Sequence, residues 1–205
     1  MREMFNGAES FVQTLCWDLT GKLIGSMFQD SSGVLGTVED GCVGGAHTTS
    51  SLRTAVGMWC DDEATAIETY GHISEWDTSE VTNMDTLFNA HEGYTVYCST
   101  AASFNEDIGK WVTAKVTSMY LTFRSAAAFN QDISRWDVGK VTSMHRTFFF
   151  ATAFNSDISR WNVEKVTDMY DTFAQAISFN ADISGWQTSK VTTMHGTFHG
   201  ALAFN

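Results

Sequence analysis

Residues 129–153 read FNQDISRWDVGKVTSMHRTFFFATA, and the same order of residue types returns at 104–128, 154–178 and 179–203. A further copy surrounds Trp76. Self-similarity at a period of roughly 20–50 residues is the signature of repeat architectures, in which one unit buries its apolar side only by stacking on the next. The sequence therefore predicts a stack of 25-residue units with one internal column of tryptophans. Its members are Trp76, Trp111, Trp136, Trp161 and Trp186.

The spacing of apolar residues within a unit predicts two kinds of local structure. Trp136 and Val138 are two apart, which favours a short strand that pairs with the same strand of the next unit. The apolar residues that follow, Val141, Met144 and Phe148, are three and four apart, which favours a short helical turn. Short parallel strands with one short helical turn per 25-residue coil predict a leucine-rich-repeat-like solenoid.

Changes in composition and period divide the chain into four predicted segments. The first residues follow the repeat pattern in weakened form, and a stretch rich in Gly, Ser and Thr then interrupts it. Helical spacing of apolar residues follows and ends at Gly71, as expected of a helical N-terminal cap. The segments are 1–30, the terminal coil of a preceding array; 31–50, a linker or terminator loop; 51–70, the helical cap; and 71–205, the repeat array with an insertion at 89–103.

The charge of the chain argues against two classes of partner. Twelve basic and 24 acidic residues give a net charge of -12, which repels phosphate backbones and anionic membrane surfaces. We therefore expect no nucleic-acid partner. No stretch approaches the roughly 20 apolar residues of a membrane span, so we expect no membrane insertion. A hydrophobic content of 43% is enough for a sizeable core.

The repeated motif FNxDISxWxVxKVTxMxxTFxxA resembles the 25-residue repeat of BspA-like bacterial surface proteins, which also occurs in large extracellular proteins of microalgae and other protists. The resemblance is strong over 71–205 and weak over 1–28. The segment AVGMWCDDEATAIETYGHISEW, residues 55–76, also resembles the helical lead-in of the protist members. The resemblance implies an extracellular or cell-surface location and a role in adhesion or in a matrix. It implies no enzymatic activity.

All cysteines fall in the irregular parts of the chain, where crosslinks would hold ends and insertions in place. Proximity to the two predicted arrays favours disulfides between Cys16 and Cys42 and between Cys60 and Cys98. These bonds would indicate an oxidising, extracellular compartment. Free buried thiols are the alternative. No two cysteines have the spacing of a zinc site, so no metal is expected there.

Two functions compete for this chain. The first is a non-catalytic module that binds a protein or a cell-surface or matrix component, because residues that vary from unit to unit beside constant positions suit recognition. The second is a structural subunit docked in a larger assembly through exposed aromatic residues. The candidate binding residues are the variable Lys110, Arg135 and Arg160 and the aromatic Tyr94, Tyr97, Phe149 and Phe150.

Motifs for catalysis or cofactor binding are not found. The sequence has no nucleophile elbow and no Gly-rich phosphate-binding loop, so we expect neither an enzyme nor a cofactor. The repeats do place a row of carboxylates on the surface. Binding of calcium between them is a distant alternative, and an Asp-to-backbone turn within each unit is the default. The row consists of Asp107, Asp132, Asp157 and Asp182.

Overall fold

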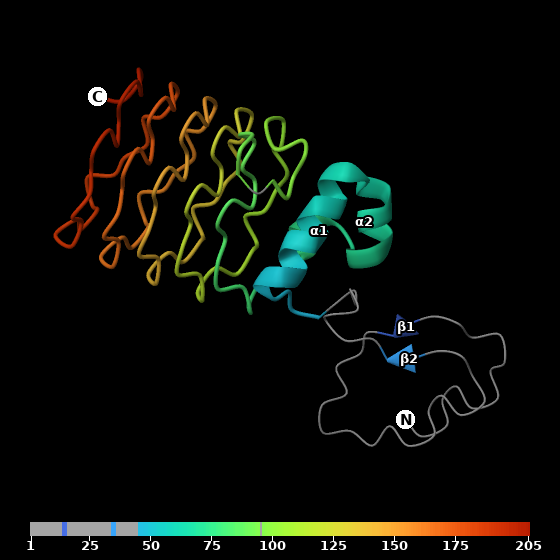
Figure 1. The fold of residues 1–205 in the computed structure, drawn as a ribbon. Helices are drawn as coiled ribbons and strands as arrows, with labels where there is room; N and C mark the ends of the chain where they lie inside the picture. Colours follow the sequence, from blue (N-terminus) through green and yellow to red (C-terminus); the bar gives the residue numbers. More distant parts are fainter. Residues whose placement is uncertain (1–13, 16–33, 36–44, 95) are drawn as a thin grey trace, which may run out of the picture.

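A computed structural model describes residues 14–15, 34–35, 45–94 and 96–205. Two short strands form a two-stranded parallel sheet, and two helices precede the repeats (Figure 1). The described elements are β1 (Thr14–Leu15), β2 (Val34–Leu35), α1 (Thr49–Asp61), α2 (Glu63–Tyr70) and the 3-10 turn η2 (Ile73–Glu75). The predictions for most of segments 1–30 and 31–50, including Cys16 and Cys42, lie outside the described residues.

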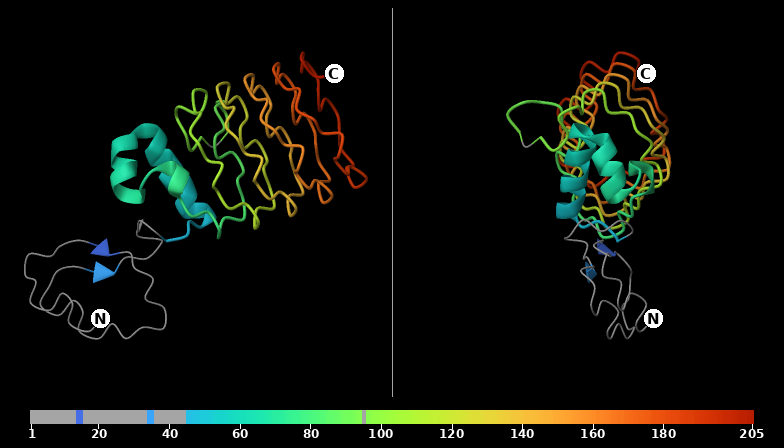
Figure 2. Two further views of the ribbon diagram at one scale, coloured as in Figure 1. Left: turned by 180° about the vertical axis from the view of Figure 1, so that it is seen from behind. Right: turned by 90° about the vertical axis from the view of Figure 1, so that its right-hand side faces the viewer.

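Residues 71–205 wind into units that stack side by side, with α1 and α2 at the end of the stack next to the first unit (Figure 1, Figure 2). Hydrogen bonds between residues 25 apart hold the units in register. In one row, the side chain of an Asn accepts a hydrogen bond from the backbone of the next unit: the backbone N–H of Asn155 donates to Oδ1 of Asn130 at 2.7 Å. Another joins the N–H of Thr167 to the carbonyl oxygen of Thr142 at 2.8 Å. We call residues 71–205 the repeat stack.

The predicted leucine-rich-repeat-like solenoid, built on short parallel strands and one helical turn per coil, is wrong. In the described part of the repeat stack there are no strands, only isolated parallel bridges between single residues of neighbouring units, such as Ser118 with Ser143 and Ser143 with Asp168. The stretch from Val141 to Phe148, which was expected to be a helical turn, contains no helix: residues 141–144 are irregular apart from the bridge at Ser143, and the residues after Met144 are in turns.

Alternating hydrogen bonds explain why neither strand nor helix forms. The N–H groups of Leu121 and Phe123 donate to carbonyl oxygens of the next unit, whereas those of Thr122 and Arg124 donate to the residue three positions earlier. Leu121 has a φ of 57°, in the left-handed region that non-glycine residues rarely occupy. Because consecutive N–H groups donate in turn to the next unit and to the same unit, neither the hydrogen-bond pattern of a helix nor that of a strand can extend.

Stacked phenylalanines run through the core. Phe148 lies against Phe154, the first residue of the next unit, with ring centroids 3.8 Å apart, and it also lies 5.6 Å from Phe173 of that unit. The rings are nearly parallel in both pairs. Phe148 also lies 5.5 Å from Phe123 of the preceding unit, so one ring joins three consecutive units of the stack.

The tryptophans also line the interior. Trp111 is nearly parallel to Trp76 and Trp136, with ring centroids 6.2 and 6.5 Å away. The indole Nε1–H of Trp136 donates to the carbonyl oxygen of Ile108 in the preceding unit at 3.1 Å, so this buried polar group is satisfied. Trp136 is 3% exposed, while Trp186 in the last unit is only partly buried.

The two helices cover the first unit. Leu52, Val56 and Trp59 are buried along α1, and Trp59 meets Trp76 edge-to-face at 5.9 Å. At the start of α1 the hydroxyl of Thr49 accepts hydrogen bonds from the N–H groups of Thr82 and Asn83, both at 3.2 Å. In later units a carbonyl oxygen of the preceding unit takes this place. Helix α1 thus provides the first unit with the hydrogen-bond acceptor that a preceding unit provides for later ones.

A row of buried threonines gives one test of this packing. Thr147 is fully buried and its hydroxyl donates to the carbonyl oxygen of Met119 at 2.8 Å. Thr147→Val keeps the shape but removes the donor, so we expect a loss of about 1 kcal/mol in the free energy of unfolding. The matched control is Thr142→Val, because the Thr142 hydroxyl makes a similar bond on the exposed surface. Equal losses in urea unfolding of the two variants would contradict the prediction.

Candidate functional site

The insertion after the first unit is attached to the end of α1. Cys60 and Cys98 are joined by a disulfide bond, the pairing that the sequence favoured. Beside it, the hydroxyl of Ser99 donates to a carboxylate oxygen of Asp61 at 2.6 Å. The inserted residues project from the flank of the repeat stack (Figure 2). The disulfide therefore holds an exposed loop against the flank.

This loop places an aromatic ring over an arginine of the repeat stack. The guanidinium of Arg124 lies 4.9 Å from the ring centroid of Tyr94 and 5.5 Å from that of Phe149 in the next unit. A second guanidinium, of Arg146, lies 5.2 Å from Phe149 and 5.1 Å from Tyr170. Such cation–π contacts contribute about 0.5–2 kcal/mol each, depending on how much water is excluded. We call these five residues the arginine–aromatic patch.

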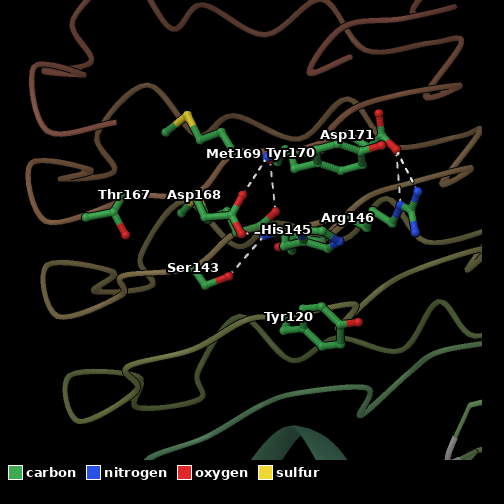
Figure 3. A network of polar contacts seen from close by, with 12 residues as sticks. Tyr120, Ser143, His145, Arg146, Thr167, Asp168, Met169, Tyr170 and Asp171 are labelled. Atoms are coloured by element: carbon green, nitrogen blue, oxygen red, sulfur yellow. Dashed lines mark hydrogen bonds and ion pairs between the residues drawn. The ribbon is translucent and has the colours of Figure 1, made fainter. Parts of the chain in front are cut away.

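A column of stacked rings runs beside the patch. The ring of His145 lies 5.0 Å from Tyr120 and 4.9 Å from Tyr170. Its Nδ1 is 3.2 Å from Oδ2 of Asp168. Figure 3 shows the three rings one above another and Arg146 directed at the carboxylate of Asp171. The three half-buried rings come from three consecutive units, and His145 in the middle contacts the ring on either side.

The two arginines differ in how their charge is satisfied. Arg146 donates from Nε and Nη2 to Oδ2 of Asp171, at 3.1 and 3.0 Å. Arg124 is 7% exposed, and within the described residues its Nε and Nη1 have no hydrogen-bond partner. Burial lowers the pKa of Arg124, and the nearby charge of Arg146 acts in the same direction. A guanidinium nevertheless keeps its proton in proteins, so Arg124 is a buried cation without a carboxylate.

The structure brings some of the predicted binding residues together. Tyr94 and Phe149 meet on Arg124, and Phe150, 43% exposed, packs edge-to-face on Phe149 with ring centroids 4.7 Å apart. Tyr97 lies apart from this group, over the guanidinium of Arg53 in α1 at 5.1 Å. Three of the four predicted aromatic residues therefore share one surface.

The predicted basic residues do not join the patch. Lys110 forms an ion pair with Glu75, and both side chains are 62% exposed. Solvent screens such an exposed ion pair, so it contributes little to stability. Arg135 borders a shallow groove together with Lys110 and Asp137, and Arg160 is exposed. No structural observation selects these three residues as a binding site.

The Asp row forms local turns. Oδ1 of Asp132 accepts from the N–H of Ser134 at 2.9 Å, and the same bond recurs from unit to unit. Hydrogen bonds from Ser134 lower the pKa of Asp132, and hydrogen bonds from Ser159 lower that of Asp157. Over the described ranges no group of three or more His, Cys, Asp or Glu side chains could hold a metal ion. The calcium alternative therefore finds no support in the structure.

Sequence reasoning missed the two arginines at the centre of the patch. Arg124 and Phe149 occupy the same repeat position 25 residues apart, which was enough to predict that they are neighbours. The contact with Tyr94 could not be predicted in this way, because the insertion does not follow the repeat period. The missed signal was an arginine at a position where the later units have Phe149, Ala174 and His199.

Comparison with known families places the chain. Residues 48–138 and 93–205 match the family described as "Mycoplasma protein of unknown function, DUF285". The chain belongs to this family. Searches of curated proteins and of solved structures found no match. Membership in DUF285 supports the resemblance to BspA-like surface repeat proteins at the coarse level of a surface repeat protein of unknown function. The match does not identify the protist or microalgal subgroup.

In the part of the chain that the structure describes, none of the helices has the length and apolar character needed to cross a membrane.

Proposed function

We propose that this DUF285 chain is a non-catalytic, extracellular binding module that recognises a protein at the cell surface or in the matrix through the arginine–aromatic patch. The observation that carries the proposal is the convergence of Tyr94, Arg124 and Phe149 from an insertion and two repeat units. Tyrosine and arginine dominate the binding energy of protein interfaces, where they sit in well-packed, desolvated surroundings. The patch has that composition.

Two further observations support the extracellular location. The disulfide between Cys60 and Cys98 is of a kind that persists in oxidising environments and is rare in the cytosol. The family is associated with surface proteins. The disulfide also holds the insertion that carries Tyr94. The same bond therefore supports the extracellular location and positions part of the binding surface.

Binding of the fluorescently labelled full chain to intact cells of the producing organism tests this proposal. We expect the double variant Tyr94→Ala, Phe149→Ala to bind at least tenfold more weakly, because both rings on Arg124 are lost. The matched control is Val112→Ala, since Val112 is exposed to 45%, borders the groove at Arg135 and lies outside the patch. Unchanged binding by the double variant, or equal losses in both proteins, would reject the patch as the binding surface.

A further inference from the structure

We propose that Arg124 is the receptor for a carboxylate carried by an acidic side chain of a protein partner, which binds between the insertion and the repeat stack. This inference rests on the proposed function and specifies the chemistry that the patch recognises. It concerns a residue that no sequence motif singled out.

The first step is the missing counter-charge. A buried charge is costly unless it is paired and hydrogen-bonded. Among the described residues, Nε and Nη1 of Arg124 have no hydrogen-bond partner, and the groups that lie against the guanidinium are the rings of Tyr94 and Phe149. The chain has 24 acidic residues and a net charge of -12. An arginine that is 93% buried beside a second arginine, in a chain this acidic, indicates a site that is completed from outside.

The second step is geometric. A guanidinium offers its donors in two forks, one between Nε and Nη2 and one between Nη1 and Nη2. In Arg124 the unpartnered buried atoms are Nε and Nη1, one in each fork. Each fork therefore contains a buried donor without a partner, and a carboxylate is well matched to such paired guanidinium donors. Approach requires the Tyr94 ring to move off the guanidinium, and Tyr94 is 40% exposed on the inserted loop.

A neighbouring pair shows which partner an arginine takes in this patch. Arg146 contacts Phe149 as Arg124 does, but it also has the carboxylate of Asp171 at 3.0 Å. The two arginines can therefore be compared within one molecule. Arg146 is paired with a carboxylate of the chain itself, whereas Arg124 has no such partner among the described residues. An external acidic side chain would give Arg124 the same coordination.

The surroundings favour a protein as the source of the carboxylate. Exposed apolar side chains lie around this site: Tyr94 lies over Arg124 and is 40% exposed, and Phe150, which packs on Phe149, is 43% exposed. Val96, on the same inserted loop as Tyr94, is 44% exposed. A peptide can cover such apolar surface while placing one carboxylate at the centre, which is the usual anatomy of an interface hot spot. A phosphate or a sugar acid would cover less of it.

Arginine Nε–Hε signals in nitrogen-15 NMR spectra of the intact, disulfide-bonded chain test the inference directly. The probes are acetyl-Glu-Phe-amide, the neutral acetyl-Gln-Phe-amide, inorganic phosphate and glucuronate, all at the same ionic strength. We expect a saturable shift of the Arg124 signal with the glutamate peptide and at least tenfold weaker binding of the other three. Arg160 provides an exposed reference signal that should not saturate.

The variants Arg124→Gln and Arg160→Gln complete the design. With the glutamate peptide followed on the Phe149 amide, Arg124→Gln should raise Kd at least tenfold and Arg160→Gln should leave it unchanged. An Arg124 signal that ignores the glutamate peptide, or tighter binding of phosphate or glucuronate, overturns the inference. The wild-type titration decides even if Arg124→Gln does not fold. If Arg124→Gln still binds cells while the Tyr94, Phe149 double variant does not, the proposed function stands and the carboxylate site fails.

Discussion

Replacing Trp136 by alanine is expected to lower the free energy of unfolding by about 3–5 kcal/mol, the range seen when a large buried aromatic side chain is removed. Trp136 is 3% exposed, stacks on Trp111 and lies 6.0 Å from Phe123 of the preceding unit. The substitution also removes the indole donor to the carbonyl oxygen of Ile108. Urea titration with calorimetry of the full chain measures the loss.

Two other positions provide controls for this experiment. Trp186 makes the same indole hydrogen bond, to Ile158 at 3.1 Å, but it is only partly buried in the last unit. Trp186→Ala should therefore cost clearly less than Trp136→Ala, because less apolar surface is lost from the core. Arg135→Ala, on the exposed side next to Trp136, should change stability by less than about 0.5 kcal/mol. A loss below about 1 kcal/mol for Trp136→Ala would show that the tryptophans do not support the stack.

Breaking the bond between Cys60 and Cys98 is expected to cost about 4 kcal/mol. The bond closes a loop with a sequence separation of 38 residues, and in the chain-entropy model it acts by restricting the unfolded chain. The double variant Cys60→Ala, Cys98→Ala removes the bond without leaving free thiols at these positions. Calorimetry of this variant and of the wild type, both without reductant, measures the effect.

Reduction of the double variant separates the two predicted disulfides. Any further loss of stability on adding reductant to it reports on Cys16 and Cys42, whose pairing stays a prediction. The loss of the Cys60–Cys98 bond should also weaken cell binding, because Tyr94 is carried by the insertion that the bond holds. Unchanged stability of the double variant would mean that hydrogen bonds such as that from Ser99 to Asp61 suffice to hold the insertion.

The sequence allowed good predictions where the repeat period applies. Constant spacing of Phe129, Trp136 and Met144 and their counterparts predicted which side chains face inward, and these three are at most 3% exposed. Two helices, α1 and α2, lie in the segment where apolar spacing indicated them. The inward-facing residues could be predicted because burial depends on side-chain type and on the repeat period, and both can be read directly from the sequence.

The prediction of local backbone structure failed for a physical reason. Spacings of two, three and four residues were interpreted as a strand and a helical turn, but Arg146 and Phe150 have φ values of 52° and 58°. These left-handed conformations are unfavourable for non-glycine residues in isolation, so no propensity could predict them. Their cost is offset by hydrogen bonds to the next unit, such as that from Arg146 N–H to the carbonyl oxygen of Tyr170 at 2.9 Å.

The sequence by itself determined the 25-residue repeat, the inward-facing residues and the acidic charge of the chain, because each follows from residue type and position alone. Only the tertiary structure decided that the units lack strands, since neighbouring units supply the hydrogen bonds that select the backbone conformation. It alone also decided that Tyr94 covers Arg124. An insertion breaks the period on which sequence reasoning relied, and its contacts depend on where the disulfide and the flank of the stack hold it.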